Sequence, residues 1–279
     1  MTGFYLYCIR NKNGPKISGW GINGDERVYV VPYREIEAVV SEVDLEEFSS
    51  EEIQRKAQED LNWIKEKAQI HEKVIEKAMG LNADLRGLYA DRRGKNPRGI
   101  TAVIPMKFGT IFKTRKKLEG AIKKHYFTFK KGLENLTGKQ EWSVKVYLNR
   151  KILEEEVKKN SSAVREKEKE VASMPEGMAY FMQKQVDEVV SKETDKIFRD
   201  YGEKIFKTLR RRAESGLRGK ILEKEFTGKS LPMFLSAIFL VSEEKLEDFV
   251  KEINKLNKEY KNKGFVFEYS GPWPPYNFI

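Results

Sequence analysis

Hydrophobic and polar positions change their period several times along the chain, and each change marks a predicted element. The first quarter contains short β-branched and aromatic runs separated by Asn-Gly turns, which predicts strands near 4–9, 17–22, 27–31 and 36–43. Apolar residues then recur at helical spacing as far as Gly80, a natural helix stop. Because Ser49-x-x-Glu52 forms a capping box, this pattern predicts one long amphipathic helix that begins there.

The rest of the first half predicts another strand and helix. Residues 100–105 read as a strand, and Pro105 favours a position at a sheet edge. A helix is expected from Thr114 to near Gly138. The basic Gly/Pro segment 91–99 lacks the spacing of a phosphate-binding loop, so we expect a surface loop there.

The second half repeats a simpler order. Alternation predicts a strand at 142–148, a charged helix follows, and a second capping box, Ser173-x-x-Glu176, begins another helix. The remaining pattern predicts strands and a helix in the order 221–226, 233–241, 242–264 and 265–269. This is the β-α-β-β-α-β order of a ferredoxin-like unit, in which right-handed crossovers place both helices on one face of the sheet.

The fold class expected is therefore α+β with two domains. We expect an N-terminal α+β domain at 1–138, a modified ferredoxin-like domain at 139–270, and a tail at 271–279 that docks on the domains. The length of 279 residues suits two domains. No apolar run reaches the roughly 18 residues of a membrane span, and the first residues lack a signal-peptide pattern. With a single cysteine, Cys8, which reads as a buried strand residue, the chain is expected in the cytoplasm.

The net charge of +10 admits a nucleic acid, an acidic lipid or an acidic protein as a partner. Much of this charge is interleaved Lys and Glu, which is typical of a solvated helical surface. Residues 263–269 come close to the RNA-recognition signature, and an RNA-binding module with a ferredoxin-like sheet is the alternative function. However, the signature lies on the fourth strand instead of the third, and Val266 replaces its small residue. We expect the aromatic face to pack under the helices and no nucleic acid to bind.

Residues for catalysis are missing from the pattern. Neither histidine has a second ligand or acid pair at suitable spacing: His71 reads as a histidine at the buried edge of a helix, bonded to a carbonyl or carboxylate, and His125 as helix surface. We therefore expect no catalytic residues, no metal site and no cofactor, and the chain is not expected to be an enzyme.

The segment 269–279 concentrates three prolines and four aromatic rings. Proline fixes φ and keeps the backbone extended, so such a segment is expected to dock on a groove. The candidate partner-binding residues are Trp273, Pro274, Pro275, Tyr276 and Phe278. Either the tail contacts a partner, or it packs on its own domains and stabilises them; we favour the second interpretation slightly.

Several segments resemble the gas vesicle GvpL/GvpF proteins, in the same order and over essentially the whole length. The most specific is Gly271-Pro272-Trp273-Pro274-Pro275-Tyr276-Asn277-Phe278. The supporting segments are 5–7, 31–40, 104–110 and 141–147.

This resemblance implies a non-enzymatic accessory protein of gas vesicle assembly, with an N-terminal α+β domain and a C-terminal modified ferredoxin-like domain. It also implies partners: the small, very hydrophobic shell protein GvpA and other accessory Gvp proteins. The implied location is the gas vesicle and the cytoplasm of a prokaryote.

Overall fold

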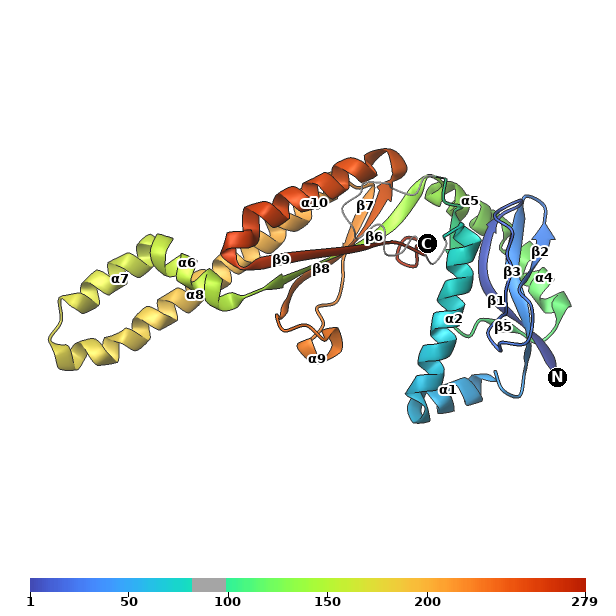
Figure 1. The fold of residues 1–279 in the computed structure, drawn as a ribbon, viewed down its shortest axis with the longest axis horizontal. Coiled ribbons are helices and arrows are strands. Elements are labelled where there is room, and N and C mark those ends of the chain that lie inside the picture. Colours follow the sequence, from blue (N-terminus) through green and yellow to red (C-terminus); the bar gives the residue numbers. More distant parts are fainter. Residues whose placement is uncertain (82–98) are drawn as a thin grey trace. The chain divides into compact units, whose positions relative to one another are not determined.

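The computed structural model describes residues 1–81 and 99–279, a mixed α/β chain that divides into two compact units (Figure 1). Unit 1 comprises Met1–Trp142 and Ser270–Ile279, and unit 2 comprises Ser143–Tyr269. Unit 2 is therefore inserted into the sequence of unit 1. The loop predicted at 91–99 lies, apart from Gly99, outside the described residues.

Unit 1 is built on an antiparallel sheet whose strand order is β2-β3-β1-β4, with β5 also paired to β1. The strands are β1 (Thr2–Asn11), β2 (Tyr29–Tyr33), β3 (Ile36–Asp44), β4 (Val103–Pro105) and β5 (Ile111–Phe112). As expected, Pro105 ends an edge strand. The strand predicted at 17–22 is wrong, because only an isolated bridge joins Trp20 to Arg27. The backbone of Ile22 is instead bonded to side chains, the Tyr7 hydroxyl and the Lys67 ammonium group.

A bulge in β1 decides which side chains reach the core. The register with β3 shifts between Leu6 and Cys8, so Tyr7 has no partner across the ladder. An extra residue reverses the side-chain alternation, and Tyr7 and Cys8 therefore both join the apolar cluster beneath α2. The prediction that Cys8 is buried in a strand is confirmed.

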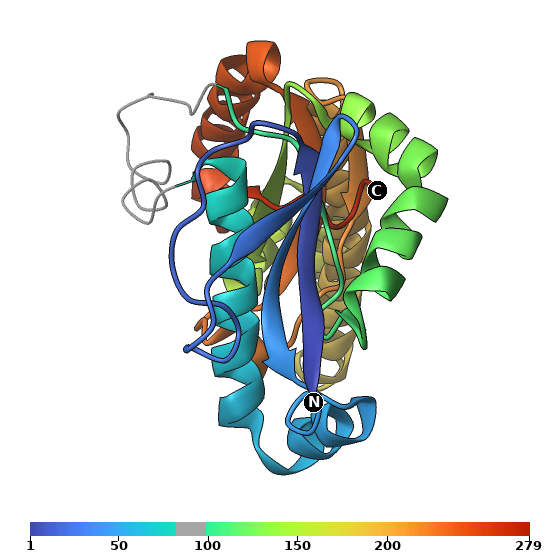
Figure 2. The same ribbon diagram turned by 90° about the vertical axis from the view of Figure 1, so that its right-hand side faces the viewer.

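Helices cover both faces of this sheet, with α2 on one side and α4 and α5 on the other (Figure 2). The helices of unit 1 among the described residues are α1 (Ser50–Glu59), α2 (Leu61–Met79), α4 (Arg115–Lys124) and α5 (Tyr126–Leu136). The single helix predicted between Ser49 and Gly80 is in fact two. The break falls at Asp60, whose carboxylate accepts from the Trp63 N–H and so caps α2. The helix predicted from Thr114 to Gly138 is likewise divided, at His125.

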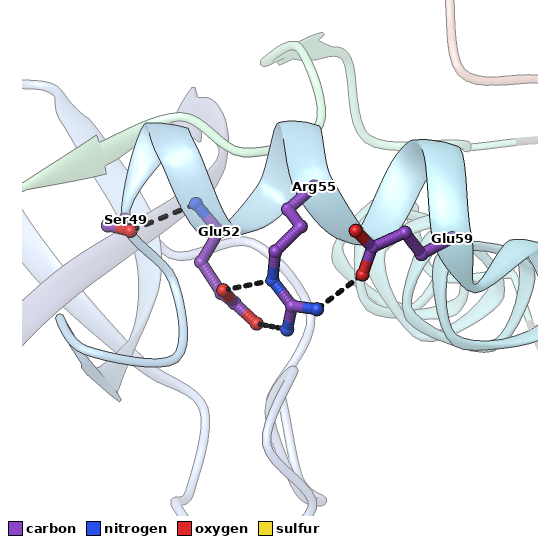
Figure 3. Close-up of polar contacts among 4 residues, drawn as sticks. All are labelled: Ser49, Glu52, Arg55 and Glu59. Atoms are coloured by element: carbon purple, nitrogen blue, oxygen red, sulfur yellow. Dashed lines mark hydrogen bonds and ion pairs between the residues drawn. The ribbon is translucent and has the colours of Figure 1, made fainter.

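The start of α1 shows half of the predicted capping box (Figure 3). The Ser49 Oγ accepts from the Glu52 N–H at 3.1 Å. The Glu52 carboxylate does not reach back to the cap. It accepts from Arg55, at 2.9 Å from Nε and 2.6 Å from Nη2, and Arg55 also bonds Glu59 one turn further on. An ion-pair chain at i, i+3 and i, i+4 spacing thus replaces the second arm of the box.

Unit 2 carries the second sheet, whose strand order is β7-β8-β6-β9. Its elements are β6 (Lys139–Leu148), α6 (Arg150–Asn160), α7 (Ser162–Ala172), α8 (Glu176–Arg210), β7 (Ser215–Arg218), α9 (Lys224–Thr227), β8 (Met233–Ser242), α10 (Leu246–Tyr260) and β9 (Phe265–Trp273). The start of β6, up to Trp142, and the end of β9, from Ser270, belong to unit 1. Rings from α8, α10 and the strands interlock: Tyr201 and Tyr260 pack on Phe265, and Phe249 packs on Phe239. Beyond the sheet, α6, α7 and α8 share a valine-rich cluster.

Three predictions for unit 2 are corrected. The charged helix breaks at Ser161, whose hydroxyl caps α7. Ser173 does not open the next helix; its hydroxyl donates to the Glu170 carbonyl at the end of α7, and Pro175 precedes α8. The strand predicted at 221–226 lies instead at Ser215–Arg218, because Gly216 lets β7 approach the Phe239 ring so closely that a Cβ there would be 2.8 Å from it.

Candidate partner-binding site

The tail begins where β9 returns to unit 1, at a position that tolerates only glycine. Gly271 has φ +153°, and a Cβ there would lie 2.8 Å from the Trp142 ring and 2.9 Å from the Glu141 carbonyl oxygen. The following Gly271–Pro272 peptide bond is cis. Because the backbone lies directly on the first part of β6, the tail is packed from its first residue.

The prolines of the tail face inward. Pro272, Pro274 and Pro275 are all buried. They lack N–H groups, so burying them leaves fewer backbone donors to satisfy. The next residues turn back on the prolines: the Tyr276 N–H donates to the Pro274 carbonyl at 2.8 Å, and the Phe278 N–H donates to the Pro275 carbonyl at 3.4 Å.

A bidentate clamp fixes the end of the tail to β6. The Asn277 backbone N–H donates to Glu141 Oε2 at 3.1 Å, and the Asn277 side-chain amide donates to Glu141 Oε1 at 2.8 Å. Glu141 is only 4 % exposed. Burial raises the pKa of Glu141, and the two bonds from Asn277 oppose that shift by stabilising the carboxylate.

The five residues predicted for partner binding are brought together but are not equally accessible. Pro274 and Pro275 are buried, and Trp273 and Phe278 are half-buried. The Trp273 indole donates to the Ser270 hydroxyl at 3.1 Å. Tyr276 is the most accessible ring, 38 % exposed, and burial of the remainder raises the pKa of its hydroxyl. A partner could therefore reach Tyr276 and the edges of two other rings, whereas the prolines serve the packing of unit 1.

Next to the tail lies a groove that the sequence did not predict. Its volume is about 830 Å³, and it runs between β4, the outer side of α5 and Ile279. Its apolar walls include Ile104, Met106, Phe127 and Phe129. The signal was present in the sequence, because Tyr126, Phe127 and Phe129 cannot all lie on one face of a helix. Tyr126 is buried, and Phe127 is 76 % exposed at the rim of the groove, which we call the α5 groove.

His71 is a structural residue. Its Nδ1 lies 3.0 Å from the Tyr5 hydroxyl and its Nε2 lies 3.1 Å from the Met106 carbonyl oxygen. Burial lowers the pKa of His71 to about 4, and the bond to Met106 opposes that shift. This confirms a buried histidine bonded to a carbonyl. Within residues 1–81 and 99–279, no group of three His, Cys, Asp or Glu side chains could hold a metal ion.

The rings that resembled an RNA-binding surface are not accessible. Phe265 is 1 % exposed and Phe267 is 8 % exposed, and both pack against Tyr260 of α10. The prediction that this face lies under the helices is confirmed. Bases stack only on exposed rings, so these two side chains offer no stacking surface. No helix in the described part of the chain is long and apolar enough to cross a membrane.

Known proteins resemble this chain over nearly its whole length. It is 22 % identical to gas vesicle protein F of Haloferax mediterranei over 275 residues, which cover 99 % of this chain and 92 % of the relative. It is also 22 % identical to gas vesicle protein F1 of Halobacterium salinarum (277 residues, 99 % and 92 %) and to gas vesicle protein L of a Streptomyces species (276 residues, 98 % and 91 %).

Two crystal structures share the fold. GvpF from Anabaena sp. PCC7120 superposes with a TM-score of 0.69 at 16 % identity, covering 100 % of this chain and 98 % of that one. GvpF from Microcystis aeruginosa superposes with a TM-score of 0.60 at 17 % identity, covering 99 % and 98 %. The sequence profile described as "Gas vesicle synthesis protein GvpL/GvpF" matches residues 3–84 and 100–279. The chain therefore belongs to the GvpL/GvpF family of gas vesicle proteins, which take part in gas vesicle formation.

Proposed function

We propose that this chain is a non-enzymatic accessory protein of gas vesicle assembly that binds the shell protein GvpA and other accessory Gvp proteins. The observation that carries the proposal is the apolar groove beside the end of the tail, where Phe127 and Ile279 are exposed in a chain of this family. A very hydrophobic shell subunit must be kept from aggregating before it adds to the wall. A charged carrier with one apolar surface can do this, and it breaks no covalent bond.

The free energy gained by burying a few apolar side chains is sufficient for holding a shell subunit. Burying one large apolar side chain contributes about 2 kcal/mol. Three or four such contacts, less the cost of association, support an affinity of roughly micromolar strength. In this proposal the tail has both roles considered above: its prolines stabilise unit 1, and the accessible edges of Trp273, Tyr276 and Phe278 belong to the contact surface.

We also propose a domain architecture to which this function belongs. The C-terminal part is interpreted as a modified ferredoxin-like domain, supported by the β-α-β-β-α-β succession and the strand order β7-β8-β6-β9. The boundaries 1–138, 139–270 and 271–279 remain our prediction for the domains and the tail. We place the chain in the cytoplasm, at the growing gas vesicle.

The test is co-purification of the affinity-tagged full chain with co-expressed GvpA. We expect GvpA to be retained by the wild-type chain and by a chain carrying an exposed substitution in unit 2, such as Phe226→Ala. Failure of the wild-type chain to retain GvpA would refute the proposed partner. A labelled RNA oligonucleotide serves as the second probe, and tight, salt-dependent binding of it would favour the RNA-binding alternative.

Removing residues 271–279 separates the two roles of the tail. The deletion uncovers the surface on which three prolines pack and leaves Glu141 without Asn277, so we expect a large drop in the melting temperature. Tyr276→Ala removes the most accessible ring of the tail and leaves the prolines and the bonds between Asn277 and Glu141 in place. We expect it to weaken GvpA retention with a much smaller drop in melting temperature than the deletion causes, and unchanged retention would exclude Tyr276 from the contact.

A further inference from the structure

We propose that the α5 groove receives an amphipathic segment of a partner protein, whose apolar side chains enter the groove while its carboxylates pair with Lys107 and Lys131. This inference rests on the proposed function, since it names the surface and the chemistry by which a gas vesicle partner would be held.

The lining calls for apolar side chains. Ile104, Met106 and Phe129 form the walls, and Phe127 and Ile279 are 76 % and 61 % exposed at the margin. Two large apolar side chains beside a concave apolar surface form the kind of patch that marks an interaction site. In the α5 helix, Tyr126, Leu133 and Leu136 already bury the inner face, so Phe127 has no role in the core of unit 1.

The charges at the rim of the groove indicate which charge the bound segment carries. Lys107 and Lys131 both line the groove and are exposed. Neither ammonium group has an ion-pair or hydrogen-bond partner among the residues that the structure describes. The other described lining residues have uncharged side chains, and Glu134 lies on α5 outside the lining. The terminal carboxylate of Ile279 sets one negative charge against the two ammonium groups, so the lining keeps a positive balance. A segment with carboxylates beside its apolar residues therefore fits better than a neutral or basic one.

Other occupants fit less well. A second copy of this chain would bring the same lysines towards each other, in a molecule whose net charge is already +10. A small polar metabolite needs convergent polar groups inside its pocket. Here the charged side chains are exposed, the walls are mainly aliphatic and aromatic, and the uncharged polar lining residues are Thr110, Thr128 and Asn135.

The experiment uses the full chain and co-expressed GvpA as the probe, with two groove variants. Phe127→Ala removes an exposed ring, and we expect about thirtyfold weaker retention, typical of losing an aromatic anchor. Lys107→Glu combined with Lys131→Glu reverses the rim, and we expect about tenfold weaker binding with a shallower dependence on salt. The matched controls are Phe226→Ala and Lys116→Glu with Lys117→Glu, which change exposed residues outside the groove.

The outcomes separate the groove from the proposed function. Weaker binding by both groove variants, with both controls like wild type, supports the groove. If wild type and groove variants retain GvpA equally, the groove assignment is overturned while the proposed function stands. If the wild-type chain retains no GvpA, the proposed function fails, and a labelled Leu/Glu amphipathic peptide then tests the groove directly against its Leu/Lys counterpart. Equal binding of those two peptides would overturn the inference, as would a dimer in sedimentation that Phe127→Ala dissolves.

Discussion

The two units hold their cores together by different means. Of the ten buried polar or charged side chains among the described residues, eight lie in unit 1, and only Thr194 and Ser236 lie in unit 2. Both cores contain ring contacts, around Tyr5 and His71 in unit 1 and around Phe234, Phe239 and Phe265 in unit 2. The difference is that unit 1 adds buried polar and charged side chains to its aromatic packing, whereas the described core of unit 2 is almost wholly apolar.

Unit 1 shows the consequence most clearly at its buried cations. Arg10 bonds Glu37 on the neighbouring strand, at 2.8 Å from Nε and 2.7 Å from Nη2, and donates to the Ala78 carbonyl at 3.0 Å. Lys67 donates to the Ile22 carbonyl at 2.9 Å and lies over the Phe48 and Trp63 rings. A network of this kind holds the buried side chains in one arrangement, but removing one member leaves the charge of its partner buried and unpaired. We therefore expect unit 1 to respond to pH and to charge deletion, and unit 2 to respond to the loss of volume.

The sequence offers a direct way to observe the units separately. All four tryptophans, Trp20, Trp63, Trp142 and Trp273, belong to unit 1. Tryptophan fluorescence therefore follows the unfolding of unit 1, whereas hydrogen exchange at α8 and α10 follows that of unit 2.

The largest effect is expected from Arg10→Ala. It leaves the Glu37 carboxylate buried without its cation, and we expect the free energy of unfolding of unit 1 to fall by about 4 kcal/mol in denaturant titrations followed by tryptophan fluorescence. The matched control is Arg10→Met with Glu37→Met, which removes both charges while keeping volume. We expect the control to lose much less. Equal losses would show that shape, and not charge pairing, matters at this site.

The next largest effect is acid sensitivity at His71. Its pKa is lowered to about 4, so the unfolded chain takes up this proton first as the pH falls. Stability is therefore fully present above about pH 6.5 and declines between about 6.5 and 4, by on the order of 3 kcal/mol. Fluorescence-detected titrations at several pH values measure it.

His71→Gln isolates that contribution, since both chains share every carboxylate. We expect the difference between wild type and variant to change across this window and to be flat above it. A difference that stays constant from pH 7 to pH 4 would mean that His71 does not titrate in this way.

A smaller effect is expected in unit 2 from Phe239→Leu. The ring contacts Phe249 at a centroid distance of 5.3 Å and Phe206 at 5.7 Å, and losing it should cost about 1.5 kcal/mol. Hydrogen exchange at α10 measures the loss. Because no charge is involved, we expect the same loss at pH 7 and pH 4.5, while tryptophan fluorescence reports unit 1 as in wild type. A strongly pH-dependent loss would break the distinction between the units.

The smallest effect is expected at Glu141, with a sign opposite to that of His71. Burial raises the pKa of Glu141, so the folded chain holds this proton more tightly than the unfolded chain does. Its contribution is fully present below the ordinary carboxyl pKa and is lost as the pH rises through the folded value. Relative to Glu141→Gln, the wild-type chain should gain stability on acidification. A relative loss would show that the bonds from Asn277 outweigh burial.

Local signals carried most of what the sequence predicted. Gly80 and Gly264 end their helices in the left-handed conformation, as their positions predicted, since only neighbouring residues are involved. The breaks at Asp60 and His125 were missed because the apolar stripe continues across them. Period alone does not distinguish one helix from two that share a face.

The candidate partner-binding site was also predicted only in part, because the sequence shows local features and not long-range contacts. The tail stood out by composition, and its burial follows from prolines and rings in one segment. The residue that holds the tail, Glu141, did not stand out, because it lies 136 residues from Asn277 and just before the strand predicted at 142–148. Long-range pairs such as this and Arg10 with Glu37 need the register of the sheet before they can be recognised.

The insertion of unit 2 into the sequence of unit 1 affects the order in which the two units can fold during synthesis. Residues 143–269 are contiguous, so unit 2 can fold as soon as they have left the exit tunnel. Unit 1 has its first 142 residues much earlier, yet it lacks the piece that covers Glu141 until residues 270–279 have been synthesised. Unit 1, which contains the first residues to be synthesised, is thus the last unit to be completed.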